Sequence, residues 1–432
     1  MTRRGCEGPP SAVAPAIYQD ISTCLADAVG AGGIARDALD RLLPEAGRAL
    51  AGLRRARAAG TQPFLAYADG RDNLAALAAL AGEWRRRFRR LVVLGTGGAT
   101  LGGQALAATS AEGERLLFLD NGDGDRLDRV LSGPDLERTG FLVISKSGAT
   151  AETLAQALLV LGDTKPVNVA AVITQPGESP LRRLAARFGL AVLDHDPALG
   201  GRFSAFSLVG LLPAMFAGVD GKAARDGAQA VLSAALEAPA PEDSAPAMGA
   251  ALAVAAMHAW PAASMVLMPY GPGLIPFGFW YRQLWAESLG KDGHGSTPIL
   301  APGPVDQHSQ LQLFLDGPGG NLFTILEAPE TAPRNVDPAL AEAIGAGYLG
   351  GHRLGDLIAA QARATATMLT DAGRPVRRLG VPAADARAIG ALMMHFMLET
   401  VVAAHLLGVD PFDQPAVERG KELARRDLEA EA

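Results

Sequence analysis

Residues able to bind an anion follow a short apolar run in the middle of the chain. Phe141–Ile144 is typical of a buried strand, and residues 151–161 are typical of a helix. The residues between them are Ser145, Lys146, Ser147, Gly148, Ala149 and Thr150. This stretch favours a bound anion for several reasons: the helix start has free N–H groups, the side chains include hydroxyl donors and one lysine, and the glycine is flexible. We therefore predict a site for a single phosphate group; the alternative is an ordinary loop that caps the helix.

A glycine-rich loop follows an earlier apolar run. Leu91–Leu94 is typical of a buried strand, and Gly-Thr-Gly-Gly-Ala-Thr occupies residues 95–100. The spacing resembles a dinucleotide-binding loop, with Asp120 at the end of the next strand where a ribose-binding acid would lie. Thr100, however, stands where the third glycine of that pattern belongs. The loop therefore indicates a tight turn beside a ligand more strongly than a nicotinamide cofactor.

An arginine and a glutamate are candidates for the reacting groups. Two glycines precede Arg202, and a guanidinium is a planar, permanent cation that can stabilise developing negative charge. The alternative is a solvated arginine in a surface turn. Gln283 and Glu287 are four residues apart and share one face of a predicted helix beside the apolar Trp285. A carboxylate beside a hydrophobic wall is suited to general-base chemistry, and the alternative is an exposed glutamate paired with Lys291.

Three other residues complete the set of candidates. His308 lies in a polar loop and is the histidine best suited to proton transfer, whereas His258 and His395 lie in apolar helices and are expected in the core. Gln414 and Lys421 flank the start of the last helix. Taken alone, Lys421 would be interpreted as a solvated surface lysine.

Composition restricts the class of protein. The chain has 432 residues, of which 49% are apolar and 20% charged, and this predicts a soluble protein of two or three domains. A net charge of −7 argues against nucleic acid or an anionic membrane as the main partner. Cys6 and Cys24 are the only cysteines, too few for a disulfide framework or a cysteine metal site. The uncharged run 245–268 contains Pro261, so we predict a buried helix to about Trp260 and a strand at 264–268 rather than a membrane span.

Strand-like and helix-like runs alternate along most of the chain, after a first stretch of about ninety residues that is expected to be helical. This alternation predicts an α/β fold with parallel sheets and helices on both faces. The predicted strands of a first unit are 91–94, 116–119, 141–144, 169–173 and 191–193, and those of a second are 264–268, 297–300, 321–326 and 376–379. The proline-rich stretch 238–246 is the predicted linker.

Five stretches resemble the glucose-6-phosphate isomerase family and occur in its order: Val143–Thr153, Gly200–Ser204, Gln283–Lys291, Asp306–Leu313 and Asp413–Lys421. The resemblance implies two sugar-isomerase (SIS) domains, each a mainly parallel sheet with helices on both faces, plus N- and C-terminal helical segments. The expected boundaries are an N-terminal helical segment at 1–60, domains at 61–220 and 221–410, and a C-terminal helix at 411–432. The family also implies a homodimer with shared active sites and no metal, and we expect no cofactor. The N-terminal residues lack the apolar core of a signal peptide, so we expect a cytoplasmic protein.

The resemblance also implies residue roles. The phosphate site would comprise Gly98, Ala99, Thr100, Ser145, Lys146, Ser147, Gly148, Ala149 and Thr150. Glu287 would move a proton between C2 and C1, and Arg202 would stabilise the enediolate. His308, from the partner subunit, and Lys421 would assist ring opening, while Gln283 and Gln414 would contact the sugar. Two departures stand out: Ala99 replaces the family's usual serine, for which Thr100 would substitute, and Asp410 replaces an asparagine.

The predicted function is therefore reversible isomerisation of glucose 6-phosphate and fructose 6-phosphate. Such a reaction needs a base over a carbon acid, a cation beside the enediolate oxygens and a remote phosphate handle, and the residue types supply all three. The alternatives are an isomerase of the same fold that also accepts mannose 6-phosphate, a non-catalytic phosphosugar-binding regulator and, third, a dehydrogenase.

Overall fold

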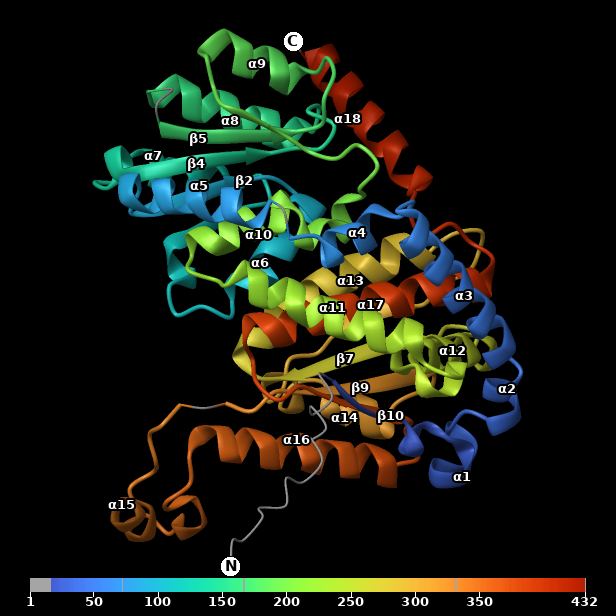
Figure 1. The fold of residues 1–432 in the computed structure, drawn as a ribbon. Helices are drawn as coiled ribbons and strands as arrows, with labels where there is room; N and C mark the ends of the chain where they lie inside the picture. Colours follow the sequence, from blue (N-terminus) through green and yellow to red (C-terminus); the bar gives the residue numbers. More distant parts are fainter. Residues whose placement is uncertain (1–16, 72, 166–167, 331, 432) are drawn as a thin grey trace, which may run out of the picture.

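The computed structural model describes residues 17–71, 73–165, 168–330 and 332–431. Figure 1 shows two sheets, each covered by helices, with further helices between them. The first sheet has the order β3-β2-β4-β5-β6, and all of its neighbouring strands are parallel. These strands are β2 (Arg90–Leu94), β3 (Leu116–Leu119), β4 (Thr139–Ile144), β5 (Val169–Thr174) and β6 (Val192–Asp194).

Helices bury both faces of this sheet because its strands are apolar on both faces. Val92 and Val143 face one helical layer, and their neighbours Val93 and Leu142 face the other. The first layer comprises α7 (Gly124–Leu131), α8 (Ala151–Asp163) and α9 (Pro180–Phe188). The second comprises α5 (Leu74–Arg87), α6 (Leu101–Ala107) and α10 (Leu208–Phe216).

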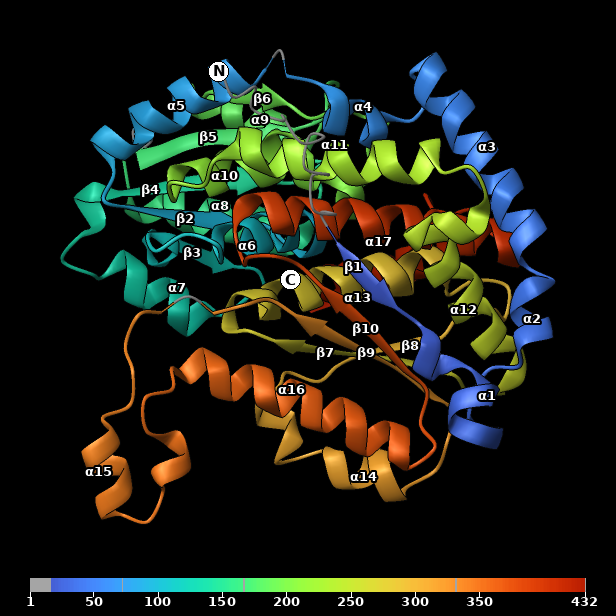
Figure 2. The same ribbon diagram turned by 60° about the horizontal axis from the view of Figure 1, so that its bottom comes forward.

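The second sheet has the order β1-β10-β9-β7-β8 and is parallel except for β1. Its strands are β1 (Tyr18–Asp20), β7 (Ser264–Tyr270), β8 (Thr297–Leu300), β9 (Asn321–Glu327) and β10 (Val376–Gly380). One face packs on α12 (Ala245–Ala259), α13 (Ile275–Leu289) and α17 (Ala386–Leu407). The other packs on α14 (Leu311–Asp316) and α16 (Leu354–Asp371), as Figure 2 shows.

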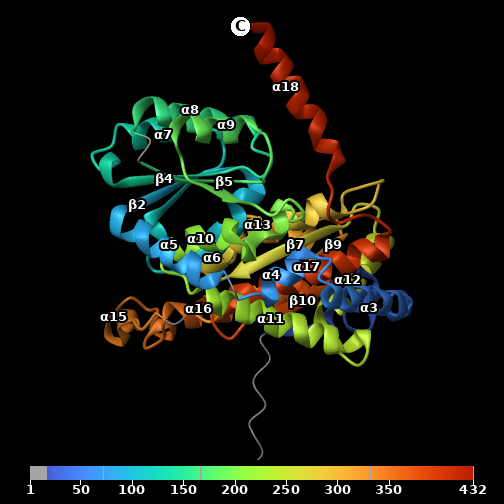
Figure 3. The same cartoon turned by 45° about the horizontal axis from the view of Figure 1, so that its top comes forward.

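The remaining helices flank these layers or extend from them. They are α1 (Ala26–Val29), α2 (Arg36–Asp40), α3 (Leu43–Ala59), α4 (Pro63–Asp69), α11 (Gly221–Glu237), α15 (Pro338–Ala343) and α18 (Glu418–Glu431). Figure 3 shows α18 projecting from the body, and Figure 1 shows α15 at the end of an extended arm. By length and composition α17 could cross a membrane, but 83% of its most apolar window is buried inside the protein, which makes it a core helix.

The predicted α/β fold class is confirmed, and three local predictions are wrong. The N-terminal segment contains β1, which pairs antiparallel with β10 and adds a strand where only helix was expected. The stretch 238–246 is a packed connection, because Ser244 is buried and the helices that it joins both pack on α17. His258 is not in the core but exposed near the end of α12, whereas His395 is buried as expected.

The domain boundaries stay a prediction. All strands of the first sheet lie within 61–220, and β7 to β10 lie within 221–410, but β1 joins the second sheet from the N-terminal segment. Cys24 is a buried free thiol, and Cys6 lies outside the described residues.

Candidate active site

The loop after β4 is held by its own hydroxyls. Ser145 is buried, and its Oγ lies 2.9 Å from Thr150 Oγ1 and accepts a hydrogen bond of 3.1 Å from the N–H of Gly148. Gly148 has φ +64°, and a Cβ there would lie 2.3 Å from the Oγ of Ser179, so the turn requires glycine. The Thr150 side chain does not cap α8. The loop hydroxyls therefore bond within the loop and not to the start of the helix, and the phosphate site stays a prediction.

The charge of the loop comes from Lys146. Its side chain is half-buried, and this burial lowers the pKa of the ammonium while the nearby carboxylate of Asp196 raises it. Ser147 is exposed, and its Oγ accepts a hydrogen bond from the N–H of Ala149 at 3.2 Å. The loop thus combines a cation, three hydroxyls and the start of a 13-residue helix at the carboxyl edge of the sheet, which suits an anion.

The loop after β2 lies next to this edge and touches two other parts of the site. Gly98 packs directly on Gly201, since a Cβ on Gly98 would lie 2.4 Å from the Gly201 carbonyl carbon. Gly97 has φ +58°, and a Cβ there would lie 2.9 Å from Gln283 Nε2. Thr100 is fully buried, and its hydroxyl donates to the carbonyl of Gly97 at 3.2 Å. Because this hydroxyl already makes a hydrogen bond inside the turn, the structure does not favour the expectation that Thr100 binds phosphate in place of the serine missing at Ala99.

Arg202 is the centre of the polar network. It is only 3% exposed, so the alternative of a solvated surface arginine is wrong. Its Nε donates to Ser288 Oγ at 2.8 Å, and its Nη1 donates to Glu287 Oε2 at 3.2 Å and to Gln414 Oε1 at 2.7 Å. Its Nη2 donates to the carbonyls of Pro411 and Asp413. Burial lowers the pKa of the guanidinium, which nearby carboxylates oppose, and an arginine remains charged in this environment.

Glu287 lies in the last turn of α13, where the helix brings Gln283 to the same face. Gln283 Nε2 donates to Glu287 Oε1 at 3.0 Å, so both carboxylate oxygens accept a hydrogen bond. Among the described residues, none provides a hydrogen-bond partner for the buried Oε1 of Gln283. Lys291 pairs with Asp413 at 2.6 Å, not with Glu287, and the alternative of an exposed Glu287–Lys291 pair is therefore wrong.

Two candidates lie away from this cluster. The parallel strands β7 and β8 are joined through α13, so Glu287 lies towards their amino edge and His308, which follows β8, lies towards their carboxyl edge. His308 is not buried in the core. Lys421 is exposed on α18 and pairs with Glu418 of the same helix at 2.7 Å. The single chain thus joins Arg202, Gln283, Glu287 and Gln414, and their hydrogen bonds include neither His308 nor Lys421.

Sequence reasoning missed several supporting residues. The Trp280 Nε1 donates to the Arg202 carbonyl at 3.1 Å, and Ser288 and Asp413 contact Arg202 as described above. Phe203 and Phe412 pack with ring centroids 5.2 Å apart. Ser288 could have been predicted from the sequence, because it directly follows Glu287. The other contacts join segments that are far apart in the chain, and the sequence gives no signal for them.

Comparisons with known proteins identify relatives of this chain. A family model described as phosphoglucose isomerase matches residues 75–301. A glucose-6-phosphate isomerase of Rubrobacter xylanophilus is 40% identical over 356 residues, which are 77% of this chain and 81% of the relative. One of Thermus thermophilus is 39% identical over 361 residues, which are 81% and 85% of the two chains.

Solved structures extend the match over most of the chain. A hypothetical protein from Thermus thermophilus has a TM-score of 0.82 and 34% identity, with 95% of this chain and 99% of that chain covered. A glucose-6-phosphate isomerase from Chlamydia trachomatis has a TM-score of 0.70 and 25% identity, with 83% and 73% covered. These matches show that the chain belongs to the phosphoglucose isomerase family.

Proposed function

We propose that this protein interconverts glucose 6-phosphate and fructose 6-phosphate through a cis-enediolate, as an enzyme of glycolysis and gluconeogenesis. One observation carries the proposal: the Glu287 carboxylate lies 3.2 Å from the buried guanidinium of Arg202. Gln283, which donates to Glu287, lies against Gly97 of the glycine loop. A base and a fixed cation are therefore held within hydrogen-bond distance of each other. The names of the relatives at about 40% identity agree with this reaction.

Each residue has a role that its surroundings support. Residues 145–150 bind the phosphate and fix the sugar relative to the base, which converts binding energy into orientation. Glu287 removes the proton from C2 of the open aldose and returns it to C1, while a hydroxyl proton moves from O2 to O1. Arg202 stabilises the negative charge that develops on the enediolate oxygens. The Oε1 of Gln283 is available to accept a hydrogen bond from a sugar hydroxyl.

We propose further that the active enzyme is a cytoplasmic homodimer in which His308 serves the partner's site. The position of His308 at the other end of the β7-α13-β8 crossover supports this, because its own Glu287 lies at the opposite edge. The arm around α15 supports a partner chain, since Leu340, Ile344 and Tyr348 are each at least 69% exposed on it. For Lys421 to assist ring opening, α18 would have to move towards the site.

The test is a coupled assay with fructose 6-phosphate on the wild type, Glu287→Gln and the matched control Glu178→Gln, whose side chain is 74% exposed. We expect Glu287→Gln to lower kcat by about 100- to 10,000-fold, the usual contribution of a general base, with little change in substrate binding. The control should match the wild type. In heavy water the wild-type product should carry deuterium at the exchanged carbon. Normal turnover by Glu287→Gln would refute the assignment.

A further inference from the structure

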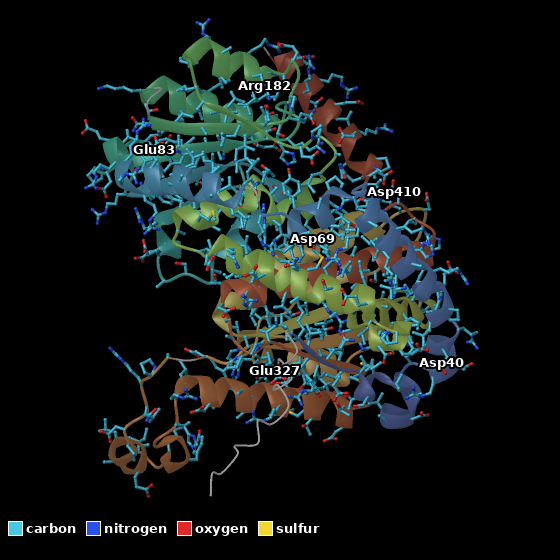
Figure 4. All side chains as sticks on the ribbon, viewed as in Figure 1. Asp40, Asp69, Glu83, Arg182, Glu327 and Asp410 are labelled. Carbon is cyan, nitrogen blue, oxygen red and sulfur yellow. The ribbon has the colours of Figure 1, made fainter. Side chains whose placement is uncertain are left out.

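The short segment between α17 and α18 carries Gln414 and is held by two cations. Arg202 binds it through the carbonyls of Pro411 and Asp413 and through the Gln414 side chain. Lys291 binds it through the carboxylate of Asp413 at 2.6 Å and through the carbonyl of Asp410. Figure 4 shows Asp410 beside the base of α18. Lys291 is therefore a second anchor for the segment that supplies a ligand to Arg202.

The position of Lys291 connects this anchor to the proposed base. It follows Gly290, where α13 ends, and is four residues after Glu287. The side chain is only 11% exposed, so its ammonium is directed at the segment and not at bulk solvent. The loop after it is fixed in turn, because Trp285 Nε1 donates to Ser296 Oγ at 2.9 Å. Movement of the segment relative to Glu287 is thus restrained from the end of the same helix.

The charges around Arg202 show what Lys291 prevents. The carboxylates of Glu287, Asp413 and Asp410 each raise the pKa of the guanidinium, so all three act on its charge. The hydrogen-bonded ion pair with Lys291 holds the pKa of Asp413 below its usual value, so this carboxylate is ionised and already has a cation. Without Lys291 the freed carboxylate would be drawn to Arg202, the other cation that acts on it. It would then compete with Glu287 and Gln414 for the guanidinium.

We propose that Lys291 is a positioning residue for the isomerase reaction: it binds Asp413 and Asp410 and thereby preserves the hydrogen bonds of Arg202 to Glu287 and Gln414. This inference rests on the proposed function. Lys291 does not touch the reacting atoms. Lys291 instead acts through the charge and position of Arg202, which matter most when negative charge develops in the transition state. A substitution should therefore change kcat much more than KM.

The experiment compares steady-state kinetics for Lys291→Met, Lys291→Arg, Asp413→Asn and the double variant Lys291→Met/Asp413→Asn. We expect Lys291→Met to lower kcat about tenfold, the effect of one weakened charge-assisted hydrogen bond, with KM within about twofold. Lys291→Arg should retain most of the activity. The double variant should be faster than Lys291→Met, because the competing carboxylate is gone. Lys222→Met is the matched control, since Lys222 also pairs with an aspartate at 2.7 Å but is 67% exposed on α11.

A second measurement does not depend on catalysis. Amide hydrogen exchange of the peptide 409–417 should be faster in Lys291→Met than in the wild type, while peptides of the first sheet should be unchanged. Unchanged exchange would overturn the inference, and so would a double variant as slow as Lys291→Met or a loss shared equally between kcat and KM. If the wild type itself does not isomerise fructose 6-phosphate, the proposed function fails, and the role of Lys291 in that reaction fails with it. The hydrogen-exchange measurement then decides by itself whether Lys291 holds the segment in place.

Discussion

A mixed dimer tests whether two chains share each active site. Glu287 lies near one end of α13, and His308 lies beyond the strand to which that helix returns. The helix has 15 residues, which corresponds to a length of about 22 Å. Because Glu287 and His308 lie towards opposite edges of the sheet, we expect His308 to be too far from its own Glu287 to act on the same sugar. Homodimers of Glu287→Gln and of His308→Ala should therefore each be nearly inactive.

Combining the two inactive proteins should restore a defined fraction of the activity. Unfolding and refolding an equal mixture makes about half of the dimers mixed, if the chains pair at random across a two-fold axis. Every mixed dimer then has one site with both lesions and one intact site. The expected activity is about a quarter of the wild-type value per subunit. The assay is coupled turnover of fructose 6-phosphate before and after refolding, with exchange of subunits verified by mass.

The control is each single variant taken through the same refolding alone, which should stay inactive. If exchange is complete and the mixture also stays inactive, each mixed dimer must contain one site without Glu287 and one without His308. His308 would then act in its own chain, and the argument from the two ends of α13 would be wrong.

Three further predictions rest on the local structure. Thr150→Ala should weaken binding of fructose 6-phosphate by about 1.5–3 kcal/mol, measured as KM or as competition by inorganic phosphate. The same substitution should not affect turnover of free fructose, and equal losses on both sugars would contradict the phosphate site. Gly98→Ala should lower both the melting temperature and kcat, because its Cβ would lie 2.4 Å from the Gly201 carbonyl carbon, whereas Gly124→Ala, with no atom within 4 Å, should change neither. Burial lowers the pKa of His395, so the unfolded chain binds its proton first and the free energy of unfolding should fall as pH drops below about 6.5. His395→Gln should flatten that slope in urea titrations at about pH 5 to 7, and an unchanged slope would show that other groups cause it.

Much of the fold could be predicted from the sequence because its strands are short apolar runs between helical ones. The bounds 116–119 and 297–300 are those of β3 and β8. The predicted helix-face pair Gln283 and Glu287 is also present, since a spacing of four residues fixes it locally. The pairing of β1 could not be found in this way, because its three residues carry little pattern and depend on the free edge of β10.

The sequence alone determined the residue types and their order: the hydroxyl-rich loop at 145–150, the glycines before Arg202, and the glutamate four residues after Gln283. It could not determine which charges meet. The sequence predicts Lys291 as an alternative partner for Glu287, four residues away, but Lys291 pairs with Asp413, and Arg202 pairs with Glu287. Local spacing allows either pairing. Only the packing of the segments around 202, 287 and 411–414 against one another brings a buried guanidinium within reach of the carboxylate, because a desolvated cation must find partners wherever the fold supplies them.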